Sequence, residues 1–268
     1  MEKPNLKTSK PRIILGAGLA GLSAAFFLQK GYQIFEQEPQ IGGLCRSRCI
    51  DGYTFDYDGH LLHFRNKFSK NLVRQLLGDN LRCLRRNSGV SLLGCELSYP
   101  FQAHLFGLPA KVIQECISGF IQAQLKKDRK LKPKANFQDW ALDSFGPGMA
   151  KYFILPYNRK FWNIPLQNLT PQWVNDYIPV PAINDVLRGA VAQSKKLIGY
   201  NARFWYPRRG GIDGLISAFK DQLSCDIEMR HQAVEIDLAK KSVRFSNGRG
   251  VKFNQLISTI PLPEMLQL

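Results

Sequence analysis

The sequence predicts an α/β fold in which a Rossmann-like dinucleotide-binding domain is interrupted by a mainly helical insertion. Three observations indicate this fold: a glycine-rich turn follows the first apolar run, helical periodicity dominates the middle of the chain, and short alternating runs with turn residues fill its last quarter. We expect the first segment of the dinucleotide-binding domain at residues 11–75, the inserted substrate domain at 76–203, and a second, β-rich segment at 204–268.

The first segment begins with a strand and a glycine-rich turn. The apolar run Arg12–Leu15 is typical of a buried strand, and three glycines follow it in the spacing G-x-G-x-x-G: Gly16, Gly18 and Gly21. In this fingerprint the first glycine permits a tight turn, the second lets the backbone approach a pyrophosphate, and the third lets the next helix pack closely. Because glycines also serve ordinary turns, the residues that follow decide the interpretation.

A helix and an acidic residue complete the fingerprint. We expect a helix over residues 19–30, a left-handed stop at Gly31 and a second strand over 32–35. Glu36 follows that strand, 20 residues after Gly16, where an acid accepts hydrogen bonds from ribose hydroxyls and repels a 2′-phosphate. A second glycine-rich turn comes next: Gly42 and Gly43, with Arg46 as a cation that could hold the pyrophosphate from its other side.

Three stretches in this order resemble a known family: GAGLAGLSAAFFL, IGGLCRS and FDYDGHLLH. They resemble the N-terminal, FAD-binding half of the amine-oxidase superfamily, which includes protoporphyrinogen oxidase, phytoene desaturase and UDP-galactopyranose mutase. The resemblance implies that FAD is the cofactor, that Gly59 and His60 lie against the flavin ring, and that the backbone of Val234 meets the adenine. The alternative interpretation of His60 is an ordinary loop histidine.

Two motifs of the inserted segment are similar to elements of UDP-galactopyranose mutases. The motif YPFQ implies that Tyr99 and Gln102 line the substrate cleft, and P-Y-N-x-K-x-W implies that Asn158 and Trp162 face a sugar nucleotide. By physical chemistry alone, the first motif is a strand that runs into a proline turn and the second is an aromatic helix end packed in the core.

One position departs from the mutase pattern. Fifteen residues after the motif tryptophan the mutases have an arginine that binds the substrate diphosphate, and counting without gaps leads here to Tyr177. A tyrosine supplies neither a permanent charge nor a bidentate fork to phosphate. The departure argues against mutase activity and leaves the prediction of a flavoprotein unchanged.

Composition limits the other function classes. The chain has 268 residues, 44% hydrophobic and 22% charged, with a formal net charge of +16. A basic run, Lys126–Lys134, could meet nucleic acid or an anionic membrane, but no nucleic-acid motif accompanies it, so we favour a solvated loop and neither partner. Six cysteines without a C-x-x-C pair and four histidines without a ligand pattern predict no metal site. The sequence shows no secretory signal or long apolar run, which favours a cytoplasmic location.

Three functions remain open at this stage. The first is an FAD-dependent oxidoreductase of the amine-oxidase or protoporphyrinogen-oxidase type, in which hydride passes from a small-molecule substrate such as an amine to the flavin. The second is a UDP-galactopyranose mutase-like isomerase, with a nucleotide sugar as substrate and NAD(P)H as a candidate reductant. The third is a non-catalytic nucleotide-binding fragment, since superfamily members continue beyond the length of this chain. By resemblance, the catalytic candidates are His60, Tyr99, Gln102, Asn158 and Trp162.

Overall fold

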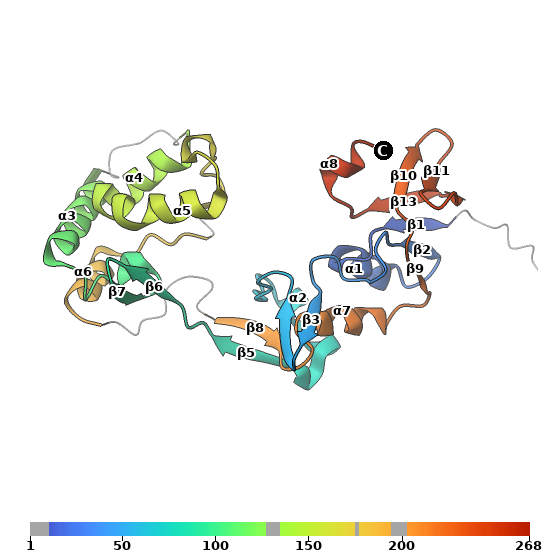
Figure 1. Cartoon of the computed structure of the whole chain (residues 1–268), viewed down its shortest axis with the longest axis horizontal. Coiled ribbons are helices and arrows are strands. Elements are labelled where there is room, and N and C mark those ends of the chain that lie inside the picture. Colours follow the sequence, from blue (N-terminus) through green and yellow to red (C-terminus); the bar gives the residue numbers. More distant parts are fainter. Residues whose placement is uncertain (1–10, 127–134, 175–176, 194–202) are drawn as a thin grey trace, which may run out of the picture. The chain divides into compact units, whose positions relative to one another are not determined.

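The computed structural model describes residues 11–126, 135–174, 177–193 and 203–268. The chain forms two compact units: unit 1 comprises the chain up to Leu84 and Trp205–Leu268, and unit 2 comprises Arg85–Phe204 (Figure 1). We expected the first boundary at 75/76, but it falls at 84/85 because Leu77 and Leu81 are buried in the core of unit 1. Residues 127–134 of the basic run lie outside the described residues.

A parallel four-stranded sheet is the centre of unit 1. Its strand order is β13-β1-β2-β9, with bounds Gln255–Ser258, Arg12–Leu15, Tyr32–Phe35 and Ile227–Glu228. Strand β1 pairs in parallel with β13 on one side and β2 on the other, so segments from opposite ends of the chain lie side by side. The strands predicted at 12–15 and 32–35 are confirmed.

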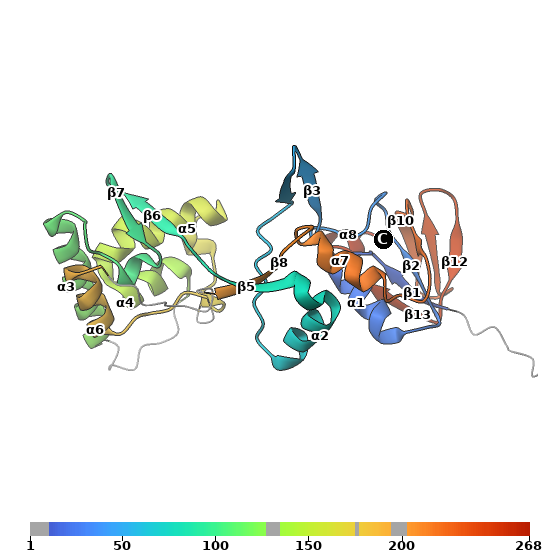
Figure 2. The ribbon, with the colours of Figure 1, turned by 90° about the horizontal axis from the view of Figure 1, so that it is seen from below.

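The two faces of this sheet are covered differently. Ile14 packs into a cluster with the helices α1 (Leu19–Leu28), α2 (Lys67–Leu77) and α7 (Asp213–Lys220), and α7 contacts both other helices (Figure 2). Its neighbours Ile13 and Leu15 pack on the opposite face, against Phe245 of a second sheet. This alternation is the period of two that a strand imposes on its side chains.

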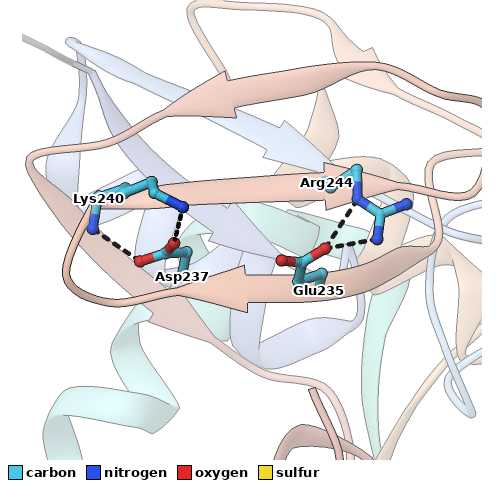
Figure 3. A network of polar contacts seen from close by, with 4 residues as sticks. All are labelled: Glu235, Asp237, Lys240 and Arg244. Carbon is cyan, nitrogen blue, oxygen red and sulfur yellow. Dashed lines mark hydrogen bonds and ion pairs between the residues drawn. The ribbon is translucent and has the colours of Figure 1, made fainter.

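The second sheet is antiparallel and lies within the β-rich segment that the sequence predicts at 204–268. Its strands are β10 (Ala233–Asp237), β11 (Ser242–Phe245) and β12 (Gly250–Lys252). The dipeptide Asn247 and Gly248 predicts a hairpin turn. These residues join β11 to β12, and Gly248 has φ +84°. Figure 3 shows two ion pairs on this sheet, Glu235 with Arg244 and Asp237 with Lys240 at 3.0 Å.

Two smaller strand pairs complete unit 1 and its connections. The hairpin of β3 (Ser47–Ile50) and β4 (Tyr53–Asp56) follows the second glycine turn. Strands β5 (Leu81–Arg85) and β8 (Arg203–Pro207) pair where the chain leaves unit 1 and returns to it. Short helical turns lie at Gly78–Asn80 and at α8 (Leu262–Met265).

Unit 2 is mainly helical, as predicted for the insertion. It contains α3 (Ala110–Lys126), α4 (Phe137–Met149), α5 (Leu155–Trp162), α6 (Ile183–Val191) and the hairpin β6 (Gly89–Leu92) with β7 (Cys95–Ser98). A π-helical turn, Ala150–Ile154, joins α4 to α5, and 3₁₀ turns lie at Phe101–Ala103 and Leu166–Asn168. No helix among the described residues is long and apolar enough to cross a membrane.

Glycine contacts explain how tightly α3 and α4 pack. A Cβ on Gly146, whose φ is +74°, would lie 2.1 Å from the carbonyl oxygen of Gly119. The sequence predicts that the helix that begins at Phe137 stops at Gly146, and the helix is interrupted there, because Gly146 is non-helical. A second helical stretch continues beyond this kink to Met149.

Candidate functional site

The first glycine turn of unit 1 has no room for side chains at two of its three motif positions. Gly16 has φ +96°, and a Cβ there would lie 2.6 Å from Oγ1 of Thr259. A Cβ on Gly21 would lie 1.9 Å from the carbonyl oxygen of Gly16, so helix α1 packs directly on the turn. The N-cap of α1 is Gly18, which has no side chain that could cap the helix. The N–H groups at this helix terminus are therefore open to an anion.

Glu36 holds the same turn from the end of β2. Its side chain is 6% exposed, and Oε2 accepts a hydrogen bond of 2.7 Å from the backbone N–H of Ala17. Oε1 accepts a second bond of 3.0 Å from the N–H of Glu38. Each carboxylate oxygen has a further lone pair, so Glu36 can still accept hydrogen bonds from ribose hydroxyls.

The second glycine turn lies against the first. Gly42 donates its N–H to the carbonyl oxygen of Ala17 at 2.9 Å, and Gly42 and Gly43 have φ of +108° and +56°. Arg46 donates from Nε to the carbonyl oxygen of Gly43 at 2.7 Å, and its guanidinium lies 4.8 Å from the ring centre of Tyr57. The cation is therefore anchored beside the glycines.

A cleft of about 450 Å³ brings most of these residues together. Among the predicted residues, its lining includes Gly16, Gly18, Glu36, Gly43 and Arg46. Gly21 and Gly42 are not among the residues that line the cleft. Val234 is absent from the lining, to which its neighbours His231, Gln232 and Ala233 contribute; Val234 is the extra residue of a β-bulge and is 39% exposed.

The predicted flavin contacts Gly59 and His60 lie outside this cleft. They form a tight turn in which Asp58 accepts hydrogen bonds from both: Oδ1 from the N–H of Gly59 at 2.7 Å, and the carbonyl oxygen from the N–H of His60 at 2.9 Å. Nδ1 of His60 is buried and finds no hydrogen-bond partner among the described residues. A buried nitrogen without a hydrogen bond costs free energy, so a ligand that formed a hydrogen bond with this nitrogen would remove that cost.

The four substrate candidates of unit 2 are held in two different ways. Gln102 and Asn158 are 3% and 5% exposed, and their side-chain amides donate to the carbonyl oxygens of Pro179 at 3.0 Å and Ile154 at 2.8 Å. Trp162 is 37% exposed and meets Trp173 edge to face at 5.1 Å. The guanidinium of Arg86 lies over the ring of Tyr99 at 5.3 Å.

Tyr177, at the position where the mutases have an arginine, contacts Trp173, the residue that also meets Trp162. Its ring lies 6.2 Å from that of Trp173, and the residue is 41% exposed. Within the described ranges of the chain, no three His, Cys, Asp or Glu residues come together as a metal-binding group.

Comparison with known proteins decides what kind of domain unit 1 contains. A family model described as an NAD(P)-binding Rossmann-like domain matches residues 14–77. The crystal structure of reduced UDP-galactopyranose mutase is similar to this chain with a TM-score of 0.88 and 29% identity, over 97% of this chain and 57% of the mutase. The chain has a Rossmann-like dinucleotide-binding domain, and its fold is similar to that of the mutase.

More distant structures share the fold of this chain. A putative protoporphyrinogen oxidase from Exiguobacterium is 18% identical, with a TM-score of 0.66, over 97% of this chain and 61% of its own. Putrescine oxidase is 14% identical, with a TM-score of 0.58, over 94% and 58%. An uncharacterized protein in the nifH2 3′ region of Methanothermococcus thermolithotrophicus is 41% identical over 56 residues, 20% of this chain and 55% of that protein. The chain therefore spans less than two thirds of each of these relatives.

Unit 1 also contains a polar cluster that the sequence did not reveal. Asp56 accepts through Oδ1 from Oγ of Ser47 at 2.6 Å and from the N–H of Ile212 at 3.2 Å, and through Oδ2 from the hydroxyl of Tyr206 at 2.6 Å. Burial and then this bond to Asp56 raise the pKa of Tyr206, so the phenol stays protonated. The cluster ties the β3–β4 hairpin to the turn before α7. Since Asp56 and Tyr206 are 150 residues apart, no local pattern could have predicted it.

Proposed function

We propose that unit 1 binds FAD through its ADP half in the cleft between the two glycine turns. The observation that carries this proposal is the convergence of three groups of suitable chemistry: the open N-terminus of α1 at Gly18, the buried carboxylate of Glu36 and the anchored guanidinium of Arg46. A helix N-terminus and a guanidinium suit a diphosphate, and a carboxylate suits ribose hydroxyls.

We further propose that the chain functions as an FAD-dependent oxidoreductase of the amine-oxidase or protoporphyrinogen-oxidase type. Bound FAD would supply a two-electron acceptor. The chain's own residues bind and orient it: the glycine turns receive the diphosphate, Glu36 the ribose, and the loop of Gly59 and His60 the flavin end, by resemblance. Unit 2 offers the substrate candidates Tyr99, Gln102, Asn158 and Trp162, also by resemblance.

A mutase-like isomerase is the second candidate, favoured by the 29% identity and TM-score of 0.88 to UDP-galactopyranose mutase. In that case the substrate is a nucleotide sugar and the flavin must be reduced, with NAD(P)H as a candidate reductant. Tyr177 in place of the diphosphate-binding arginine argues against it.

The experiment that tests FAD binding is a visible absorption spectrum of the purified chain after FAD is added and the excess removed by gel filtration. We expect retained flavin absorbance with the unchanged chain and its loss with Gly18→Val, since a Cβ at Gly18 points at Gly43 in the facing turn. Gly250→Val is the matched control, because Gly250 lies in strand β12, outside the cleft, with only one atom within 4 Å of its Cβ position.

Two results would contradict the proposal: no retained flavin with the unchanged chain, or equal loss with both valine variants. If flavin is retained, adding UDP-galactose to dithionite-reduced chain, and amines to oxidised chain, separates the two reaction types. Formation of the furanose isomer favours the mutase-like function. Bleaching of the oxidised flavin by an amine favours the oxidoreductase.

A further inference from the structure

Thr259 meets the first glycine turn from the end of strand β13. In the parallel pair of β1 and β13, Leu15 lies opposite Ser258, so Thr259 is the first residue beyond the pairing. Its backbone N–H donates to the carbonyl oxygen of Leu15 at 2.8 Å. Its hydroxyl Oγ1 donates to the same oxygen at 2.9 Å and lies 3.3 Å from the carbonyl oxygen of Gly16.

The turn is therefore held from both neighbouring strands. Glu36, at the end of β2, binds the N–H of Ala17 on one side. Thr259, at the end of β13, binds the carbonyl oxygens of Leu15 and Gly16 on the other. Both side chains also line the cleft.

We propose that Thr259 is a positioning residue of the dinucleotide site. The negative end of a carbonyl dipole that turned into the cleft would face the anionic diphosphate. By holding these two carbonyl oxygens, the hydroxyl keeps the turn in the conformation that receives an anion. As far as the ligand is concerned, this inference rests on the proposed binding of FAD.

The hydroxyl bond is separable from the pairing of the strands. The backbone bond from Thr259 to Leu15 already extends the β1–β13 pairing, and a valine at position 259 would keep that bond and nearly the same side-chain shape. The substitution Thr259→Val thus removes the hydroxyl bond to the turn with little change in the sheet. The substitution Thr259→Ser keeps the hydroxyl and therefore the bond.

The neighbouring residue supplies a matched control. Oγ of Ser258 is buried and has no hydrogen-bond partner among the described residues. Ser258→Ala therefore removes a hydroxyl one position away, in the same strand, without touching the turn.

The first measurement is a titration of the full chain with FAD, in which the quenching of flavin fluorescence reports binding. We expect Thr259→Val to raise the Kd roughly 3- to 10-fold, the range that follows from the loss of one hydrogen bond. We expect Thr259→Ser and Ser258→Ala to stay within about twofold of the unchanged chain, since neither removes the hydroxyl bond to the turn.

The second measurement is amide hydrogen exchange of the chain without FAD, which needs no ligand. Thr259→Val should speed exchange of the amides of residues 16–18, whereas Thr259→Ser and Ser258→Ala should not. Unchanged exchange in Thr259→Val, or an equal change in Ser258→Ala, would overturn the positioning role. Failure of the unchanged chain to bind FAD would overturn the proposed function instead, and the exchange data would still decide the role of Thr259.

Discussion

At the scale of single residues, Glu36 combines a structural role with the ligand-binding role that we propose for it. Its carboxylate is buried and accepts hydrogen bonds from two backbone N–H groups, those of Ala17 and Glu38. In Glu36→Gln the shape is kept, but the NH₂ group faces one backbone N–H, donor against donor. Hydrogen bonds to charged groups contribute about 1.5–3 kcal/mol, so we expect FAD affinity to fall roughly 10- to 100-fold.

Equilibrium titration with FAD measures this loss, and Glu235→Gln is its control. Glu235 pairs with Arg244 on the exposed face of the antiparallel sheet, where an ion pair contributes little. The prediction for Glu36 is wrong if Glu36→Gln binds FAD as tightly as Glu235→Gln does.

Single residues also show which parts of the site could be predicted from the sequence. The glycine turn, its strands and Glu36 lie within 25 residues, so spacing alone predicted them, and all fall where expected. Thr259 lies more than 240 residues from the turn that it contacts, and only the folded sheet brings it there. Local patterns cannot reveal a contact that depends on strand order.

At the scale of elements, sequence signals located several helices, missed α6, and were less informative about helix ends and strand partners. Asn136 with Asp139 three residues later predicts the start of α4, and this is confirmed, since the side chain of Asn136 accepts from the N–H of Asp139 at 3.0 Å. The sequence predicts Ser69 as the N-cap of α2, and this prediction is wrong. The N-cap is Asn66, whose side chain accepts from the N–H of Ser69 at 2.8 Å. Asn and Ser have nearly equal N-cap preference, so the sequence did not separate them. The pairing of β5 with β8 spans the whole insertion and had no local signal.

The turn before α7 allows a prediction with an adjacent control. Gly210 and Gly211 both have positive φ, +80° and +63°. A Cβ on Gly211 would lie 2.3 Å from Oγ of Ser47 and 2.6 Å from Oδ1 of Asp56, whereas a Cβ on Gly210 would meet nothing closer than 4.0 Å. Both alanine variants carry the backbone penalty of about 1–2 kcal/mol. Gly211→Ala should lose a further 1–3 kcal/mol because it disrupts the Asp56 cluster.

Urea unfolding of the two variants measures this difference in the free energy of unfolding. Equal stability of Gly210→Ala and Gly211→Ala would show that the Asp56 cluster accommodates a Cβ at position 211 without loss of stability. That result would contradict the predicted clash.

At the scale of the whole molecule, the two units have separate cores and separate candidate residues. The cleft with Gly18, Glu36 and Arg46 is built entirely from unit 1, while Gln102, Asn158 and Trp162 belong to unit 2. Each ligand should therefore stabilise mainly the unit that binds it, because a ligand lowers the free energy of only those states in which its site is formed.

This separation predicts the pattern of hydrogen exchange when FAD is added to the whole chain. At a free concentration of about 100 times its Kd, FAD should add up to ~2.7 kcal/mol to any opening that destroys its site, which slows exchange roughly 100-fold. We expect this protection in peptides that cover residues 15–22, 36–46 and 231–236, and none in the α4 and α5 peptides of unit 2. NADP⁺ at the same concentration is the control, since its 2′-phosphate would face the carboxylate of Glu36. Protection of α4 and α5 by FAD, or equal protection of unit 1 by NADP⁺, would refute the assignment of the cleft.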